Sequence, residues 1–235
     1  RRMAEGCGLT IPTVHQALLS VSPTGRGPAR VLDATPAAVE LGVPVVVFHA
    51  PTAWRWDEPA AERWLRAMDA AQGLAAGTGT RLALENPGAY RRGEPLGIVS
   101  RPADLVACAQ RYDLDVTLDT CHAGTAGIDL LAAYETMRPR LVNVHLSDLR
   151  PPRVSWQPPL VDMLWSHHQL PGDGRLDLAP LVARLHADRF ACALTVEVSF
   201  TALAFWSPKE ARRRLRGAAR FARGLFAAEG ELALT

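Results

Sequence analysis

Several features that would assign this chain to a specialised class are absent from its 235 residues. No run approaches the roughly 18 to 20 consecutive apolar residues of a membrane-spanning helix, and no secretory signal pattern opens the sequence. The formal net charge of +2 is too small to indicate a nucleic-acid or membrane surface. No β-rich run is followed by GxGxxG or GxxxxGK[ST], so the usual nucleotide-binding signatures are missing. We therefore expect an ordinary globular protein that binds no membrane, and nothing in its composition indicates a nucleic-acid partner.

Cysteine is also scarce. The four cysteines, Cys7, Cys108, Cys121 and Cys192, are widely separated and form no CxxC pair. This spacing indicates neither a zinc knuckle nor a disulfide framework. Reduced thiols in a cytoplasmic protein are the expected state.

What the sequence does contain is a regular alternation of β-rich and helical stretches, with no linker between them. The predicted strands cover residues 9–16, 43–50, 80–86, 115–120, 141–147 and 193–199, and the predicted helices cover 34–42, 58–76, 102–113, 128–138, 177–188 and 208–228. Strands that are apolar on both faces and separated by helices indicate a parallel sheet, either closed or open.

The strand count favours the closed form. A seventh, short strand is predicted near His167 and His168, and an eighth strand before Arg1 would complete a (β/α)8 TIM barrel with outer helices. The first strand would then be missing from this chain. We predict a single domain over residues 1–235.

Polar side chains end nearly every predicted strand. They are His15, His49, Glu85, Asp119, His145 and Glu197, with His122 just beyond Asp119. In a parallel barrel these ends meet at one rim, where active sites are built. A single histidine at a strand end is commonly a hydrogen-bonded rim residue, but an unpaired buried carboxylate costs several kcal/mol. Because no strand end offers Arg or Lys, a divalent metal ion is the expected counter-charge.

Five segments resemble, in order, the motifs of the xylose isomerase-like TIM-barrel superfamily. They are "LALENPG", "VTLDTCHAG", "LVNVHLSD", "HHQLPGDGRLDL" and "LTVEVSF". The resemblance implies one divalent ion held by Glu85, Asp119, His145 and Glu197. A mostly oxygen ligand set favours Mn²⁺, with Mg²⁺, Co²⁺ or Zn²⁺ as alternatives.

The same resemblance implies a metal-dependent sugar, sugar-phosphate or inosose isomerase or epimerase. Such an enzyme abstracts a proton next to a carbonyl through a metal-stabilised enediolate, and we expect Glu85 and Glu197 to act as base and acid. The residues expected to contact the sugar or polyol substrate are His15, His49, His122, His168 and Arg91. Arg91 could instead belong to a solvated loop.

Three alternatives stay open. An endonuclease IV-like zinc phosphodiesterase acting on abasic DNA shares the histidine pattern, but Ser166 stands where that family has a metal-ligand carboxylate. A dehydratase would use the same proton abstraction, and a barrel that only binds a ligand is the third possibility. A homo-oligomer is compatible with each of them.

Overall fold

The computed structural model describes residues 2–16, 30–89, 97–151 and 159–227. Their strands are β1 (Thr13–His15), β2 (Val45–His49), β3 (Arg81–Glu85), β4 (Asp115–Asp119), β5 (Leu141–Leu146) and β6 (Ala193–Val196). These strands form one sheet in the order of the chain, and β1 to β4 pair in parallel. Each of these six strands lies inside a strand predicted from the sequence, which confirms those six predictions.

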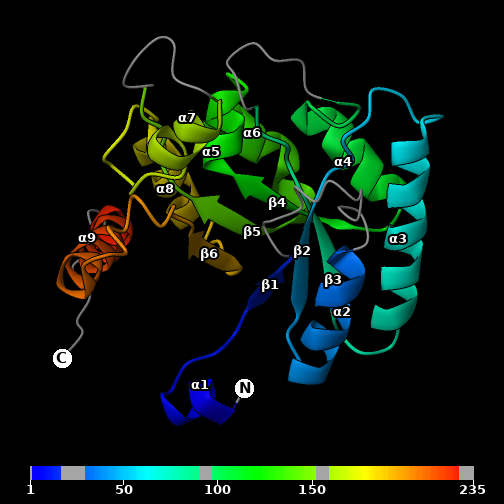
Figure 1. Cartoon of the computed structure of the whole chain (residues 1–235), viewed down its shortest axis with the longest axis horizontal. Coiled ribbons are helices and arrows are strands. Elements are labelled where there is room, and N and C mark those ends of the chain that lie inside the picture. The colour runs from blue at the N-terminus through cyan, green and yellow to red at the C-terminus, as the bar shows by residue number, and fades with distance from the viewer. Residues whose placement is uncertain (1, 17–29, 90–96, 152–158, 228–235) are drawn as a thin grey trace. The chain divides into compact units, whose positions relative to one another are not determined.

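The helices follow the same pattern (Figure 1). They are α1 (Arg2–Gly6), α2 (Arg30–Leu41), α3 (Pro59–Ala75), α4 (Pro102–Arg111), α5 (Thr120–Thr125), α6 (Leu130–Met137), α7 (Pro159–Ser166), α8 (Leu178–Ala187) and α9 (Pro208–Ala227), with a 3-10 turn at Arg138–Arg140. Proline occupies the first turn of α3, α4, α7 and α9, where its missing N–H and fixed φ favour helix initiation. No helix of the described residues is long and apolar enough to cross a membrane.

The chain divides into two compact units. Unit 1 comprises Arg1–Pro87, Leu96–Thr117 and Pro139–Asn143, and unit 2 comprises Gly88–Pro95, Leu118–Arg138 and Val144–Thr235. The strands β4 and β5 each begin in unit 1 and end in unit 2. The single domain predicted from the sequence stays a prediction.

Unit 1 is built around β2, which is buried on both faces. Val45 and Val47 form a core cluster with Ala83 and Val142, and Val47 is in register with Ala83. Side chains alternate along a strand, so the next residue, Phe48, points to the other face, where it stacks on Trp64 of α3 at 5.7 Å. An apolar run on both faces is the pattern expected of a strand that helices cover.

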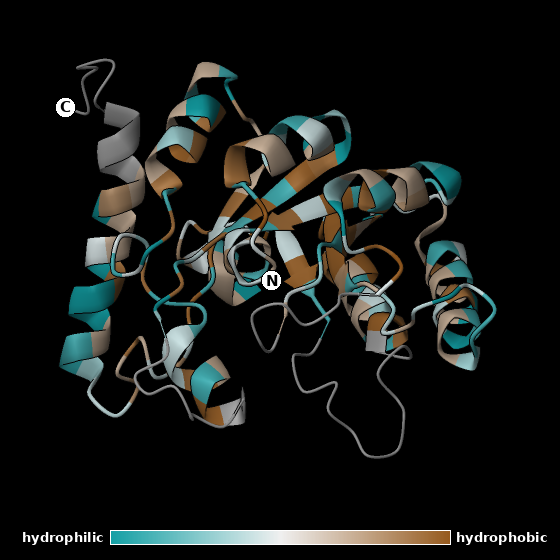
Figure 2. Ribbon diagram, turned by 90° about the horizontal axis from the view of Figure 1, so that it is seen from above, coloured by the Kyte–Doolittle hydropathy of each residue, from teal (hydrophilic) through white to brown (hydrophobic). Residues whose placement is uncertain are grey.

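Unit 2 packs α6 and α8 through a buried tyrosine. Tyr134 is 1% exposed, and its hydroxyl donates a 2.7 Å hydrogen bond to Asp188 at the end of α8. Leu181 and Leu185 of α8 are also fully buried. Figure 2 shows that α9, in contrast, interleaves hydrophilic with hydrophobic residues along its length.

One predicted strand was wrong. Near His167 and His168 the described chain has no strand, only an isolated antiparallel bridge between Asp148 and Gln169. The physical reason is the backbone of His168, whose φ of 46° is left-handed and incompatible with an extended strand. Helices α5 and α7 are a further difference, because neither lies within a predicted helix.

Candidate metal centre

Asp119 ends β4 and is fully buried, at 0% exposure. Its side chain caps α5, where Oδ1 accepts a 2.7 Å hydrogen bond from the backbone N–H of His122. The cap turns the chain immediately after the strand and leaves Oδ2 facing two imidazoles. His145 Nδ1 lies 3.7 Å from Oδ2, and His168 Nδ1 lies 3.9 Å from it.

Glu197 approaches His145 from the segment that follows β6. Its Oε2 lies 2.5 Å from His145 Nδ1, while its backbone N–H donates to the carbonyl of Leu146 at 3.3 Å. His145 is 2% exposed, so two carboxylates converge on one buried imidazole nitrogen. Asp119, His145 and Glu197 each present one ligand atom, and these atoms lie within 4.8 Å of one another.

His122 and His168 form a second group around the same carboxylate. Their rings meet edge to face at 5.3 Å, and together with Asp119 they also present ligand atoms within 4.8 Å. Ser147 Oγ lies 3.3 Å from His168 Nδ1. The backbone N–H of His168 donates to Cys121 Sγ, which helps to hold this residue in its left-handed conformation.

Two titratable side chains beside these groups are kept neutral. Burial, followed by the charge of Asp119, raises the pKa of Cys121 well above its usual value, so without a bound ion the thiol stays protonated. Burial lowers the pKa of His167 to about 4. Neither residue adds charge to the cluster at neutral pH.

Unit 1 carries its own cluster, at the ends of β1, β2 and β3. Glu85 is 1% exposed, and its Oε2 lies 3.2 Å from the Nε2 atoms of both His15 and His49. Gln16 Nε2 donates to His49 Nδ1 at 2.7 Å. His49 therefore carries its proton on Nε2, the nitrogen nearer to Glu85, because a neutral imidazole has one donor and one acceptor.

His15 differs from His49 in this respect. Its Nδ1 lies 2.6 Å from the carbonyl oxygen of Gln16, which can only accept, so Nδ1 carries a proton. In the neutral ring, Nε2 would then turn a lone pair toward Glu85 Oε2 at 3.2 Å. The contact therefore requires either a proton between the two atoms, on His15 Nε2 or on the Glu85 carboxyl, or a metal ion.

The residues present fit a divalent ion. Two carboxylates and an imidazole around one point are the donor types that Mn²⁺, Co²⁺ and Zn²⁺ accept. The structure thus groups Asp119 with His122, His145, His168 and Glu197, and it groups Glu85 with His15 and His49. Arg91 lies outside the described residues.

Sequence reasoning missed three residues that position these groups. Gln16 orients His49, Ser147 contacts His168, and Gly88 leaves room for the His122 ring, because a Cβ there would lie 2.6 Å from its Cδ2. Gln16 and Ser147 each follow a strand-end histidine closely along the chain, which is a signal that the sequence offered. Nothing in the sequence connects Gly88 to His122.

Residues 1–223 match the model of the family described as "Xylose isomerase-like TIM barrel". The chain belongs to the xylose isomerase-like TIM barrel family. The TIM-barrel fold predicted from the sequence is therefore confirmed. Within the family, Uncharacterized protein Rv0498 of Mycobacterium tuberculosis (strain ATCC 25618 / H37Rv) is 30% identical over 220 residues, covering 85% of this chain and 72% of the relative.

Solved structures with a similar fold include sugar epimerases. The D-psicose 3-epimerase from Clostridium cellulolyticum H10, solved with D-tagatose, superposes with a TM-score of 0.67 at 18% identity, covering 96% of this chain and 81% of the epimerase. The 3-keto-D-glucoside 4-epimerase from E. coli superposes with a TM-score of 0.63 at 17% identity, covering 95% of this chain and 82% of that one. At these identities the likeness establishes the shared fold.

Proposed function

We propose that this protein is a divalent-metal-dependent sugar isomerase or epimerase that abstracts a proton next to a carbonyl. The observation that carries the proposal is the convergence of Asp119 and Glu197 on His145 in a buried site. The family membership supports it, as do two epimerases among the structural relatives. The substrate class is a sugar, sugar phosphate or polyol. We expect a cytoplasmic protein, and a homo-oligomer is compatible with the proposal.

Asp119, His145 and Glu197 would hold the ion, and we propose Glu85 as the fourth ligand. Glu85 is in register with Thr117, and Thr117 and Asp119 lie on the same face of β4 because side chains alternate. Mn²⁺ is the ion we favour, with Mg²⁺, Co²⁺ or Zn²⁺ as alternatives. When bound, the ion would act as a Lewis acid that stabilises the negative charge of an enediolate.

The protein's own residues would move the proton. In the proposed mechanism one carboxylate, Glu85 or Glu197, takes the proton from the carbon next to the carbonyl, and the other returns a proton to the intermediate. The imidazoles of His15, His49, His122 and His168 would contact the substrate and orient its hydroxyls. Burial of Glu85 and Asp119 excludes water from the reacting atoms.

The substitution Glu197→Gln tests this role. It keeps the shape of the side chain and removes its basicity, so we expect a loss of at least about 100-fold in turnover. The measurement is deuterium exchange at the carbon next to the carbonyl, followed by NMR on a panel of ketoses, sugar phosphates and inososes with Mn²⁺. Glu40→Gln is the matched control, because Glu40 is exposed on α2. A Glu197→Gln protein with near-normal exchange contradicts the proposal.

A phosphodiesterase resembling endonuclease IV is the second candidate function. The observation that favours it is the additional group of Asp119, His122 and His168, which offers a place for a further ion. Metal analysis separates the two candidates. One ion per chain supports the isomerase or epimerase, whereas two or three zinc ions per chain support phosphodiester chemistry. Cleavage of DNA that contains an abasic site would decide for the nuclease.

A further inference from the structure

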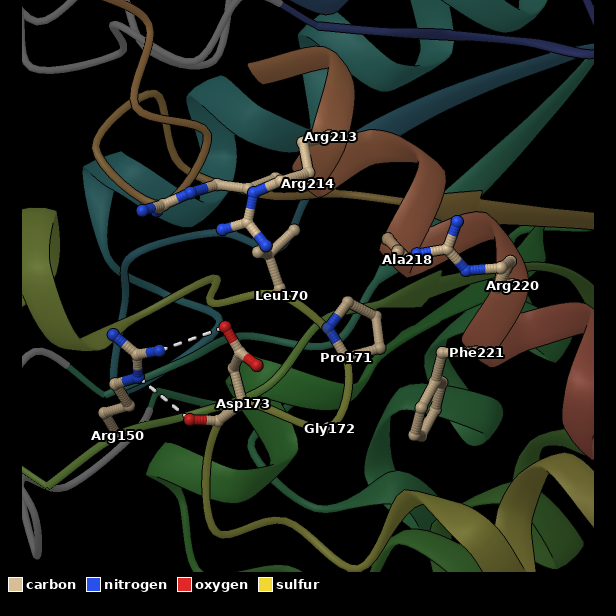
Figure 3. Close-up of a pocket in the computed structure, with 11 residues that line it drawn as sticks. Arg150, Leu170, Pro171, Gly172, Asp173, Arg213, Arg214, Ala218, Arg220 and Phe221 are labelled. Atoms are coloured by element: carbon tan, nitrogen blue, oxygen red, sulfur yellow. Dashed lines mark hydrogen bonds and ion pairs between the residues drawn. The ribbon is translucent and has the colours of Figure 1, made fainter. Parts of the chain in front are cut away.

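A pocket of about 440 Å³ lies in unit 2 beside α9, apart from the residues of the metal cluster. One wall is the segment from Leu170 to Asp173, with Arg150 next to it, and the other wall is the face of α9 that carries Arg213, Arg214 and Arg220 (Figure 3). Of these three arginines, Arg213 and Arg220 are exposed and Arg214 is half-buried, so solvent reaches the guanidinium groups that line the pocket.

The loop wall is held in place by a buried carboxylate. Asp148 is 0% exposed and accepts hydrogen bonds from the backbone N–H groups of Gly172, Gly174 and Leu176 at 2.9 to 3.1 Å. It also accepts one from the N–H of Leu149. These hydrogen bonds join the segment "LVNVHLSD", which ends at Asp148, to the segment "HHQLPGDGRLDL". They fix the loop that forms one wall of the pocket.

Loop and helix also pack closely against each other. Gly172 has a φ of +88°, and a Cβ at this position would lie 2.8 Å from the ring of Phe221 on α9. A side chain there would push α9 away from the loop. The close contact between Gly172, in its left-handed conformation, and the ring of Phe221 therefore fixes the distance between the two walls of the pocket.

Positive charge exceeds negative charge in the pocket. Four arginines line it, but only two carboxylates pair with them: Asp173 binds Arg150 at 3.1 Å, and Glu210 binds both Arg213 and Arg214, at 2.6 and 2.7 Å. Arg220 has no ion-pair or hydrogen-bond partner in the part of the chain that the structure describes. Asp148 beneath the loop is a third carboxylate, so four guanidinium groups face three carboxylates and one net positive charge remains.

We propose that this pocket binds the phosphate group of a small molecule. A phosphate monoester carries about −1.5 to −2 charges at neutral pH, so it would pair with Arg220 and accept further hydrogen bonds from the other three arginines. The planar guanidinium fork pairs its N–H groups with phosphate oxygens. The volume lies within the range of small-molecule sites, roughly 300–1,000 Å³, so the pocket accommodates more than a single inorganic ion.

Gly217 provides a sharp test, because it lines the pocket and a Cβ there would meet nothing within 4 Å. Gly217→Glu introduces a carboxylate into the pocket without removing any arginine, and Gly217→Ala is its matched control. The measurement is titration of the metal-free protein with inorganic pyrophosphate, followed by calorimetry. We expect Gly217→Ala to bind like the wild type and Gly217→Glu to bind at least about tenfold more weakly.

A second pair separates the pocket from the general charge of α9. Arg220→Gln and Arg216→Gln remove the same charge from the same helix, but Arg216 is exposed and does not line the pocket. Pyrophosphate affinity should fall about tenfold or more in Arg220→Gln and less than about twofold in Arg216→Gln. Equal losses in the two variants, or a wild-type protein that does not bind pyrophosphate, would overturn the proposal.

The phosphate could belong to the substrate or to a separate ligand, and kinetics distinguish the two. If the substrate carries it, Gly217→Glu raises KM for a ketose phosphate and leaves KM for the parent ketose unchanged. If a separate ligand carries it, both KM values stay constant while pyrophosphate binding is lost. Because binding is measured directly, failure of the epimerase proposal would leave this result interpretable.

Discussion

At the scale of single residues, the position of His122 depends on a glycine. A Cβ on Gly88 would lie 2.6 Å from Cδ2 and 2.9 Å from Cγ of His122. Gly88→Ala therefore has to move the imidazole by several tenths of an ångström. We expect activity to fall between about 10- and 100-fold, because small misplacements of groups that orient a substrate are costly. Steady-state kinetics on the substrate found by the exchange screen measures this loss.

The control for Gly88→Ala is Gly73→Ala. Gly73 lies in α3, and a Cβ there would meet nothing within 4 Å. This variant should keep full activity and gain roughly 0.5–1 kcal/mol of stability from its better helix propensity. Unchanged kinetics in Gly88→Ala would show that His122 does not orient the substrate.

The grouping of the candidate metal ligands could be predicted from the sequence, whereas the residues that position them could not. Asp119, His145 and Glu197 lie at or just beyond strand ends, and strand direction alone brings such residues to one edge. Gly88 and His122 are far apart along the chain, and only the folded chain brings them into contact. Which imidazole nitrogen carries the proton likewise depends on Gln16, whose side chain and carbonyl contact different histidines.

At the scale of elements, the first turns of α9 are tied together by one carboxylate. Hydrogen bonds from Arg213 and Arg214 lower the pKa of Glu210 from its ordinary 4.5 to about 2. These hydrogen bonds stabilise the folded state fully above about pH 4.5, where Glu210 is charged in both the folded and the unfolded chain. As the pH falls from about 4.5 toward 2, the unfolded chain takes up the proton first and this stabilisation is lost.

Glu210→Gln should reveal that loss. The variant should be less stable than the wild type at pH 7, and the difference should shrink as the pH falls from 4.5 to 3. Urea unfolding at pH 7, 5, 4 and 3 measures the free energy of unfolding for both proteins. A difference that is the same at pH 7 and pH 3 would mean that Glu210 stabilises α9 by something other than its charge.

The elements themselves follow from local patterns, with one informative exception. Apolar runs such as Val45–Phe48 predict buried strands because no other element buries both faces over so few residues. The sequence predicts a strand at His167 and His168. In the structure His168 has a positive φ, and its backbone N–H donates a hydrogen bond to Cys121 Sγ. A tertiary contact decided that conformation, and no local pattern encodes such a contact.

At the scale of the whole molecule, the proposed ion should add to the free energy of unfolding. An ion at about 100 times its dissociation constant stabilises the folded state by about 2.7 kcal/mol if the unfolded chain does not bind it. For a chain of this size that corresponds to a rise of roughly 5–10 °C in Tm. Calorimetry of the protein with EDTA and with Mn²⁺ measures the change.

Glu197→Gln supplies the comparison for this experiment, because it weakens the ion site while leaving the remaining ligands. Its Tm should rise less with Mn²⁺ than that of the wild type. A wild-type Tm that is the same in EDTA and in Mn²⁺ would argue against a metal centre. The fold could be predicted from the repeated alternation of strands and helices, but the substrate could not, since it depends on side chains from segments that follow no repeat.

The four N–H groups that converge on Asp148 have a thermodynamic consequence for the arginine-lined pocket. A loop of that kind is already ordered before a ligand arrives, so binding sacrifices little conformational entropy on that side. The arginine side chains of α9, which are long, lose conformational entropy instead when they bind a ligand. The affinity of the pocket should therefore depend on that loss of side-chain entropy rather than on a closing movement of the loop.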